Sequence, residues 1–168
     1  MHDKKEETLE QLPYIKLNGR AMNPVRSHDT DGGLDLASTH DVHLTPGQRA
    51  IVGTGLAFEI PAGYAGFVHT RSGIAKRHGI GIVNGPGLVD AGYRGEVMVN
   101  LINLDPYDAV FLPAGTRIAQ FVVQRVELPA PVEVQFLTPS PRGTGGHGST
   151  GIIELPGQLS IDDVEGAQ

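Results

Sequence analysis

Turns built on proline and glycine divide this chain into apolar segments that are too short for long helices. The clearest turn signals are Pro46-Gly47, Pro61-Ala62-Gly63, Pro86-Gly87 and Pro113-Ala114-Gly115. With 23 glycines and 12 prolines, the chain is richer in both residues than an average protein. Many short strands between such turns are typical of sandwiches, jelly rolls and barrels, so the sequence predicts an all-β domain.

Apolar residues alternate within several of these segments. Leu56, Phe58 and Ile60 share one face of a predicted strand, because successive side chains of a strand point to opposite sides. The same spacing is found in two further sets, Val97, Val99 and Leu101, and Val132, Val134 and Phe136. One short helix is predicted from Ser72 to His78, with Ser72 as its cap and Gly79 at its end.

Length and composition exclude several classes of protein. The 168 residues correspond to one globular domain, and a net charge of −6 argues against stable binding to nucleic acid. The absence of cysteine excludes disulfides and thiolate chemistry and suits a reducing compartment. No apolar run is long enough to span a membrane, and the first residues lack the apolar core of a secretory signal. We therefore expect a cytoplasmic protein that does not bind membranes.

The sequence divides into four parts. Residues 1–11 are charged and predict a flexible arm, whereas residues 12–138 carry the apolar strands of the domain. Residues 139–151 form a glycine-rich segment that cannot contribute to a core. Residues 152–168 form a mildly acidic tail that we expect to be disordered.

Two polar segments allow either a structural or a functional interpretation. Asp35 follows two glycines and could hold a hydrated cation, although a turn before an edge strand explains the same residues. Arg71 and Ser72 precede the predicted helix, where backbone amides attract anions. There, phosphate binding and simple capping are evenly balanced.

A third segment, NGPGLVDAGYRGE at residues 84–96, joins two apolar strands that predict a long β-hairpin. Asp90 lies among glycines that let a backbone approach a ligand closely. Asn84 offers both a donor and an acceptor, and Tyr93 adds a flat ring. This density of polar groups and glycines favours a functional loop.

Two segments lie nearer the C-terminus. RIAQ at residues 117–120 opens an apolar strand, and Arg117 and Gln120 are by themselves ordinary surface residues. RGTGGHGSTG at residues 142–151 could wrap phosphate oxygens with its amides and hydroxyls, or could be a linker. Because Arg142 and His147 lie within this second segment, we interpret it as a flap that closes over a ligand. The histidines of the chain form no convincing metal site.

Together, five segments in this order resemble the trimeric dUTPase family, the deoxyuridine triphosphate nucleotidohydrolases. The segments are GGLDLAS at 32–38, RSG at 71–73, NGPGLVDAGYRGE at 84–96, RIAQ at 117–120 and RGTGGHGSTG at 142–151. The resemblance implies a jelly-roll subunit in a homotrimer with active sites shared between subunits and closed by the C-terminal arm. It also implies Mg²⁺-assisted hydrolysis of dUTP to dUMP and pyrophosphate, which limits uracil incorporation into DNA and supplies dUMP for thymidylate synthesis.

The resemblance also implies a role for each matching residue. Asp90 would orient and deprotonate the water that attacks the α-phosphorus, with Gln120 close to that water and to the phosphates. Asp35 would hold Mg²⁺ through water. Since the substrate is strongly anionic and the protein is acidic, local cations are required, and Arg71 and Arg142 meet that need, with Arg117 as a further candidate. The implied phosphate and flap residues are Arg71, Ser72, Gly73, Arg142, His147, Gly148 and Ser149.

Uracil would enter the hairpin and pair with Asn84 and with backbone groups. Leu88, Val89 and Met98 would contact the nucleoside, and a narrow hairpin would exclude the methyl group of thymine. The ring of Tyr93 would lie under the deoxyribose and leave no space for a 2′-hydroxyl.

Two positions depart from the family pattern. Thr70 replaces a proline that often precedes Arg-Ser-Gly, and His147 replaces a phenylalanine of the flap. Stacking of His147 on uracil would then depend on pH.

Two other functions remain open, a dCTP deaminase-related enzyme and a regulator that senses dUTP without hydrolysing it. Intact Asp90 and Arg142 argue against the second of these.

Overall fold

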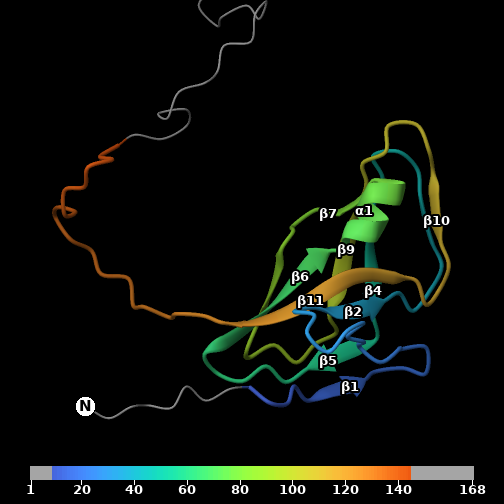
Figure 1. The fold of residues 1–168 in the computed structure, drawn as a ribbon, viewed down its shortest axis with the longest axis horizontal. Coiled ribbons are helices and arrows are strands. Elements are labelled where there is room, and N and C mark those ends of the chain that lie inside the picture. The colour runs from blue at the N-terminus through green and yellow to red at the C-terminus, as the bar shows by residue number, and fades with distance from the viewer. Residues whose placement is uncertain (1–8, 145–168) are drawn as a thin grey trace, which may run out of the picture. The chain divides into compact units, whose positions relative to one another are not determined.

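The computed structural model describes residues 9–144 and contains short strands with one helix (Figure 1). By its internal contacts the chain divides into two units, with the boundary between Pro129 and Ala130. The elements of the first unit are β1 (Tyr14–Lys16), β2 (Leu34–Ala37), β3 (Val42–Leu44), β4 (Arg49–Gly53), β5 (Leu56–Phe58), β6 (Tyr64–Thr70), α1 (Ser72–His78), β7 (Ile80–Ile82), β8 (Gly87–Asp90), β9 (Met98–Asn103), β10 (Val110–Leu112) and β11 (Arg117–Arg125).

The strands pair into four small antiparallel sheets. The largest has the order β2-β11-β6-β8, and a second has the order β4-β9-β7. Two-stranded sheets, β1-β5 and β10-β3, complete the unit. An all-β arrangement of short strands with one helix is what the sequence predicts, and this fold class is confirmed.

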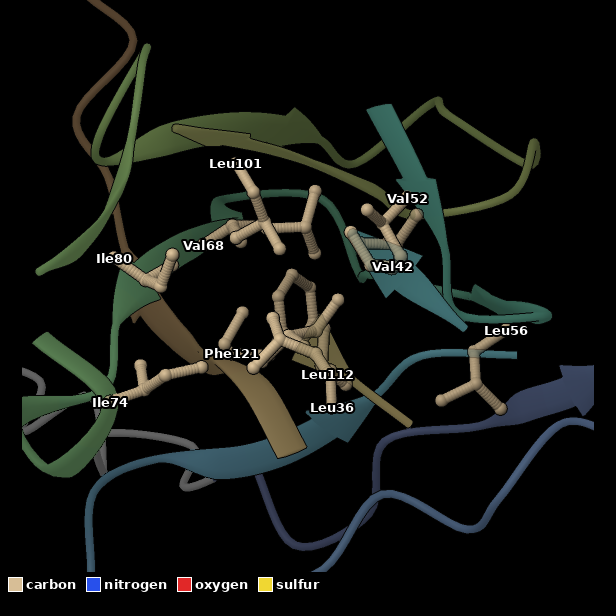
Figure 2. Close-up of a cluster of buried hydrophobic side chains, with 14 of the residues drawn as sticks. Leu36, Val42, Val52, Leu56, Val68, Ile74, Ile80, Leu101, Leu112 and Phe121 are labelled. Carbon is tan, nitrogen blue, oxygen red and sulfur yellow. The ribbon is translucent and has the colours of Figure 1, made fainter. Parts of the chain in front are cut away.

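The core lies between the two largest sheets. Phe121 of β11 and Leu36 of β2 meet Val52 of β4 and Leu101 of β9, and all four are fully buried (Figure 2). Phe121 stacks on Phe58 with ring centroids 4.6 Å apart. These contacts fix the outward faces of the sheets, on which the polar residues of interest lie.

The predicted hairpin is confirmed in its arms and wrong in its connection. β7 and β9 pair antiparallel, with Ile80 opposite Asn103. The segment between them is not a free loop, because β8 pairs with β6 in the other sheet. The partner of β8 lies about twenty residues earlier in the chain, so the local sequence pattern did not indicate it.

The helix is confirmed at residues 72–78, but its predicted cap is wrong. Arg71 occupies the N-cap position with an extended backbone, and no side chain caps the helix. Ser72 is therefore the first helical residue rather than the cap. Gly79 ends the helix at a φ of 61°, a left-handed conformation that glycine adopts readily.

Residues 130–144 of the second unit form no strand. The predicted strand face of Val132, Val134 and Phe136 is wrong here, since the three side chains are 77%, 56% and 87% exposed. Within the described part of the chain this segment has no neighbouring strand, and alternation alone does not satisfy the backbone of a strand. The predicted arm, flap and tail lie largely outside the described residues.

Candidate active site

Three strands of the largest sheet align polar residues in one row. Gln120 on β11 lies opposite Asp35 on β2 and, on its other side, opposite His69 on β6. Residues directly opposite each other in a sheet point to the same face, so all three side chains lie on one side. Gly33 gives Gln120 room, because a Cβ added at Gly33 would lie 3.3 Å from the Cβ of Gln120.

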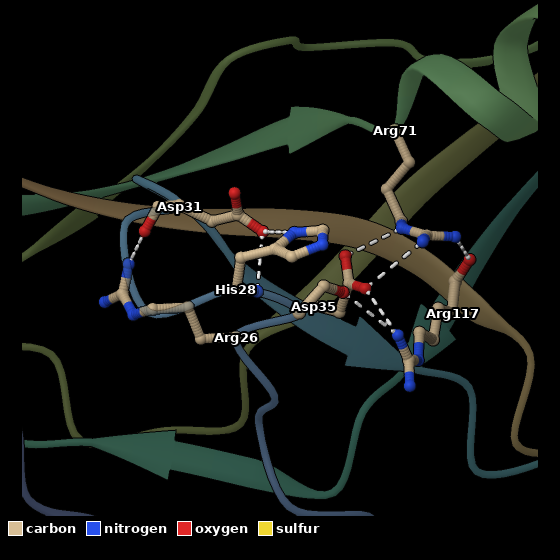
Figure 3. Close-up of polar contacts among 7 residues, drawn as sticks. Arg26, His28, Asp31, Asp35, Arg71 and Arg117 are labelled. Atoms are coloured by element: carbon tan, nitrogen blue, oxygen red, sulfur yellow. Dashed lines mark hydrogen bonds and ion pairs between the residues drawn. The ribbon is translucent and has the colours of Figure 1, made fainter.

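Asp35 binds two arginines at one end of this row (Figure 3). Arg71 donates from Nε to Oδ1 at 2.7 Å and from Nη2 to Oδ2 at 3.1 Å. Arg117 donates from Nη1 to Oδ2, also at 3.1 Å. The Asp35 side chain is only 5% exposed, whereas those of Arg71 and Arg117 are 25% and 44% exposed. The carboxylate is thus inside the protein and the guanidinium groups lie at its surface.

A β-bulge brings Arg117 to this face. In a regular strand, residues three apart point to opposite faces, so Arg117 and Gln120 would be separated. The register of β11 against β2 shifts between Arg117 and Ala119, and Arg117 lies opposite Ala37, two residues from Asp35. The bulge therefore aims Arg117 toward the same carboxylate. The sequence indicates Arg117 only as a candidate cation for the triphosphate and not its contact with Asp35, because an extra residue in one strand leaves no mark in the apolar pattern.

Of the other phosphate-binding candidates, two lie next to Arg71, one lies in the second unit, and the rest lie outside the described residues. Ser72 is exposed at the start of α1, next to Arg71, and the carbonyl of Gly73 accepts a hydrogen bond from Arg77. Arg142 is exposed within the second unit. His147, Gly148 and Ser149 lie outside the described residues.

A separate pocket of about 240 Å³ is formed by β8, the start of β9 and the segment between them. Its lining residues are Leu88, Val89, Asp90, Tyr93, Glu96, Val97 and Met98. Five of these were assigned to nucleoside or water from the sequence. Asn84 is exposed and close to Gly87, where an added Cβ would lie 3.2 Å from its Nδ2, but it does not line the pocket.

Tyr93 is held within this pocket by the backbone around it. Its hydroxyl donates to the carbonyl of Glu96 at 3.0 Å, and its amide donates to the carbonyl of Asp90 at the same distance. Gly95 allows the ring to lie on the chain, since a Cβ there would meet the ring itself. The ring is therefore fixed before any ligand binds.

Glu96 is a pocket residue that the sequence analysis did not single out. Its Oε1 accepts a hydrogen bond from the amide of Gly55 at 2.7 Å, which ties the pocket to the turn between β4 and β5. The signal was present, since Glu96 ends the segment 84–96, but its partner is distant in the sequence.

The row of polar residues and the pocket do not meet within one chain. Both flank β6, but Gln120 faces His69 and Asp90 faces Ala65, four residues away. With about 3.3 Å per residue and about 4.8 Å between strands, Gln120 and Asp90 are on the order of 16 Å apart. A single phosphorus atom cannot lie beside both side chains.

One loop beside the arginine cluster contains a perturbed acid. Asp31 accepts hydrogen bonds from the ring and the amide of His28, and Arg26 donates to the Asp31 carbonyl (Figure 3). The side-chain hydrogen bond from His28 is the main reason why the pKa of Asp31 is lowered from its ordinary value of 3.8. Asp31 forms no hydrogen bond or ion pair with Arg71 or Arg117, although Ser27 of the same loop accepts a hydrogen bond from Nη1 of Arg117 at 3.3 Å.

Residues 9–144 contain no cluster of three or more His, Asp or Glu side chains that could hold a metal ion. No helix in the same range combines the length and the apolar character that crossing a membrane requires.

These features define a β-sandwich subunit with a pocket beside Asp90 and Tyr93 and, apart from it, a pair of arginines suited to an anion. The dUTPase family model matches residues 20–151. A deoxyuridine 5′-triphosphate nucleotidohydrolase of Mycobacterium sp. (strain JLS) is 53% identical over 145 residues, which cover 83% of this chain and 94% of the relative. The chain belongs to the dUTPase family.

Solved structures agree with this assignment and with the jelly-roll prediction. A mutant dUTPase of Staphylococcus bacteriophage 80alpha with dUpNHpp matches with a TM-score of 0.80 at 29% identity. The match covers 86% of this chain and 100% of the phage chain. A mutant dUTPase from phage phi11 of S. aureus, described as revealing the coordination of a structural Mg(II) ion, matches with a TM-score of 0.70 at 27% identity. That match covers 75% of this chain and 97% of the phage chain.

Proposed function

We propose that this protein hydrolyses dUTP to dUMP and pyrophosphate. The observation that carries the proposal is the pocket containing Asp90 and the fixed ring of Tyr93, on a subunit that also exposes two arginines. A mostly apolar pocket with a few polar groups suits a nucleoside, and paired guanidinium groups suit phosphate. Membership of the dUTPase family supports the choice of substrate.

Asp90 acts as the general base in this proposal. Its exposed carboxylate at the end of β8 orients and deprotonates a water for attack on the α-phosphorus. Gln120 positions the water and phosphates, while Arg71, Ser72, Gly73 and Arg142 bind the phosphate chain. Most of the remaining rate enhancement comes from alignment of the reactants and from stabilisation of charge.

The nucleoside is selected by the walls of the pocket. Leu88, Val89 and Met98 contact the base, and Asn84 supplies a polar edge for uracil. Because Tyr93 is fixed by two backbone contacts, its ring resists displacement by a 2′-hydroxyl. His147, Gly148 and Ser149 would close the site from the flap.

Mg²⁺ suits the donor set of this proposal. Mg²⁺ usually keeps several waters and binds substrate phosphates, so it does not need a cage of protein ligands. Asp35 is the carboxylate on the phosphate side, and its remaining lone pair could accept one water of the hydrated ion. When bound, the ion would neutralise charge on the triphosphate.

The separation within one chain supports active sites shared between copies of this chain, and the resemblance to the dUTPase family implies that these copies form a homotrimer. Since Gln120 and Asp90 are on the order of 16 Å apart, a second copy must bring its pocket to the arginines of the first. The proposed partners are dUTP and two further copies of this chain. The proposed location is the cytoplasm.

A product assay tests the function. The protein is incubated with dUTP, UTP, dTTP and dCTP in the presence of Mg²⁺, and pyrophosphate and nucleotide products are measured. We expect pyrophosphate and dUMP from dUTP, and little release from the other three nucleotides. Uracil formation from dCTP without loss of dUTP would indicate a deaminase, and tight dUTP binding without turnover would indicate a sensor.

A further inference from the structure

Asp35 carries more positive charge around it than a structural ion pair requires. Its side chain is 5% exposed, and burial of a carboxylate is costly unless it is paired and hydrogen-bonded. One bidentate arginine, Arg71, already meets that requirement. Arg117 adds a second full charge on Oδ2, so the three side chains together carry a net positive charge.

The two arginine side chains are 25% and 44% exposed and keep donors that the contacts with Asp35 do not use. Arg71 uses Nε, Nη1 and Nη2 once each, since Nη1 donates to the Arg117 carbonyl at 3.0 Å, and this leaves two of its five N–H groups. Arg117 uses Nη1 for Asp35 and for Ser27 Oγ at 3.3 Å, which leaves three. Within the described part of the chain these remaining donors have no hydrogen-bond partner.

The backbone also places the second arginine here. Arg117 reaches the Asp35 face only because of the bulge between Arg117 and Ala119. Asp35 itself lies opposite Gln120, so the arginine pair adjoins the residue proposed to face the reacting phosphates.

We propose that Asp35 is a positioning residue that holds Arg71 and Arg117 side by side as a two-guanidinium clamp for the triphosphate of the substrate. This inference rests on the proposed function, and it assigns to Asp35 the placement of Arg117, until now only a candidate cation, beside Arg71. All of the contacts that form the clamp join protein groups, so the proposed clamp does not depend on a metal ion. Asp35 therefore contributes to triphosphate binding independently of any role toward Mg²⁺.

The three roles open to Asp35 change affinity in different ways. A positioning residue, when replaced, lowers triphosphate affinity even with all divalent metal removed. A pure metal ligand changes nothing under those conditions. A carboxylate that only offsets positive charge would, when removed, raise the affinity for an anion.

The test measures binding of dUpNHpp and of dUMP to the full chain in EDTA and in Mg²⁺. For Asp35→Asn we expect dUpNHpp to bind about tenfold or more weakly in both conditions, the loss expected when a hydrogen bond to a charged group is misplaced. Binding of dUMP should change by less than about twofold, because most of its contacts lie in the pocket. Asp31→Asn is the matched control, since it removes a nearby negative charge without touching either arginine, and it should leave dUpNHpp binding equal or slightly tighter, opposite to the loss expected for Asp35→Asn.

Unchanged or tighter dUpNHpp binding by Asp35→Asn in EDTA would overturn the proposal. Thermal unfolding and sedimentation establish that the variant is folded and assembled like the wild type. Should Asp35→Asn not fold, Asp35→Glu keeps the charge and the ability to bind metal but displaces the oxygens, so weaker dUpNHpp binding is again expected in EDTA. Wild-type pyrophosphate release is measured separately, so absence of turnover would overturn the proposed function while the binding data still decide on the clamp.

Discussion

Gln120 and Asp90 lie beside the same strand, β6, at positions four residues apart. Because of this register, the proposed phosphate-binding row and the nucleoside pocket of one chain are too far apart to contact the same phosphorus atom. A shared site predicts complementation between two inactive variants, Arg71→Ala and Asp90→Asn, when they are co-expressed and purified together. Each intact site then needs Arg71 from one variant and Asp90 from the other, so about a quarter of wild-type activity should return in randomly mixed trimers.

A matched pair of variants provides the control for this complementation. Tyr93→Ala and Asp90→Asn both alter the same pocket of the same chain, so mixing them should give no activity beyond that of the two parents. If Arg71→Ala and Asp90→Asn also gave no gain while forming mixed trimers, the shared site would be wrong.

The second prediction concerns the base. Asp90→Asn keeps the shape of the side chain and removes its basicity, so kcat for dUTP should fall by about 10²–10⁴-fold. Affinity for dUpNHpp should change little, because the pocket walls remain in place. Single-turnover rates and equilibrium binding test the two parts, and an unchanged kcat would exclude Asp90 from the base role.

The third prediction separates the ring of Tyr93 from its hydroxyl. Tyr93→Ala removes the surface proposed to exclude a 2′-hydroxyl, and the ratio of kcat/KM for dUTP over UTP should fall by about tenfold or more. Tyr93→Phe loses only the hydrogen bond to the Glu96 carbonyl and should retain most of the discrimination. Equal discrimination by wild type and Tyr93→Ala would show that another group excludes UTP.

The fourth prediction concerns Glu96, which joins the pocket to the turn at Gly55. Glu96→Ala leaves the Gly55 amide without its acceptor and should lower the free energy of unfolding by about 1–3 kcal/mol, with a higher KM for dUTP. Glu96→Gln retains an acceptor oxygen and should have the smaller effect on both. Thermal unfolding and steady-state kinetics measure them, and equal losses in the two variants would assign Glu96 another role.

Local patterns sufficed for part of this molecule. Alternation identified the inward face formed by Val97, Val99 and Leu101, and Gly79 marked the helix end, because both depend on neighbouring residues. The same alternation at residues 132–136 was misleading, since a strand also needs a partner to accept its backbone hydrogen bonds.

The site required long-range information. Asp35, Arg71 and Arg117 come from three distant segments, and their meeting depends on a bulge that leaves no trace in the sequence. The resemblance singled out the first two residues one by one, but it could not show that they contact each other. Glu96 escaped notice for the same reason, since its partner Gly55 lies 41 residues away.

The last prediction tests the packing that supports both faces of the largest sheet. A Cβ added at Gly66 of β6 would run into the ring of Phe121, a fully buried side chain in the core. Gly66→Ala should therefore lower the free energy of unfolding by about 1–3 kcal/mol, the usual cost of overpacking. Gly19→Ala is the control, because nothing lies within 4 Å of the added methyl group. Since β6 carries His69 and pairs with the strands of Gln120 and Asp90, dUTP turnover should fall with stability, and a fully stable Gly66→Ala would contradict this packing.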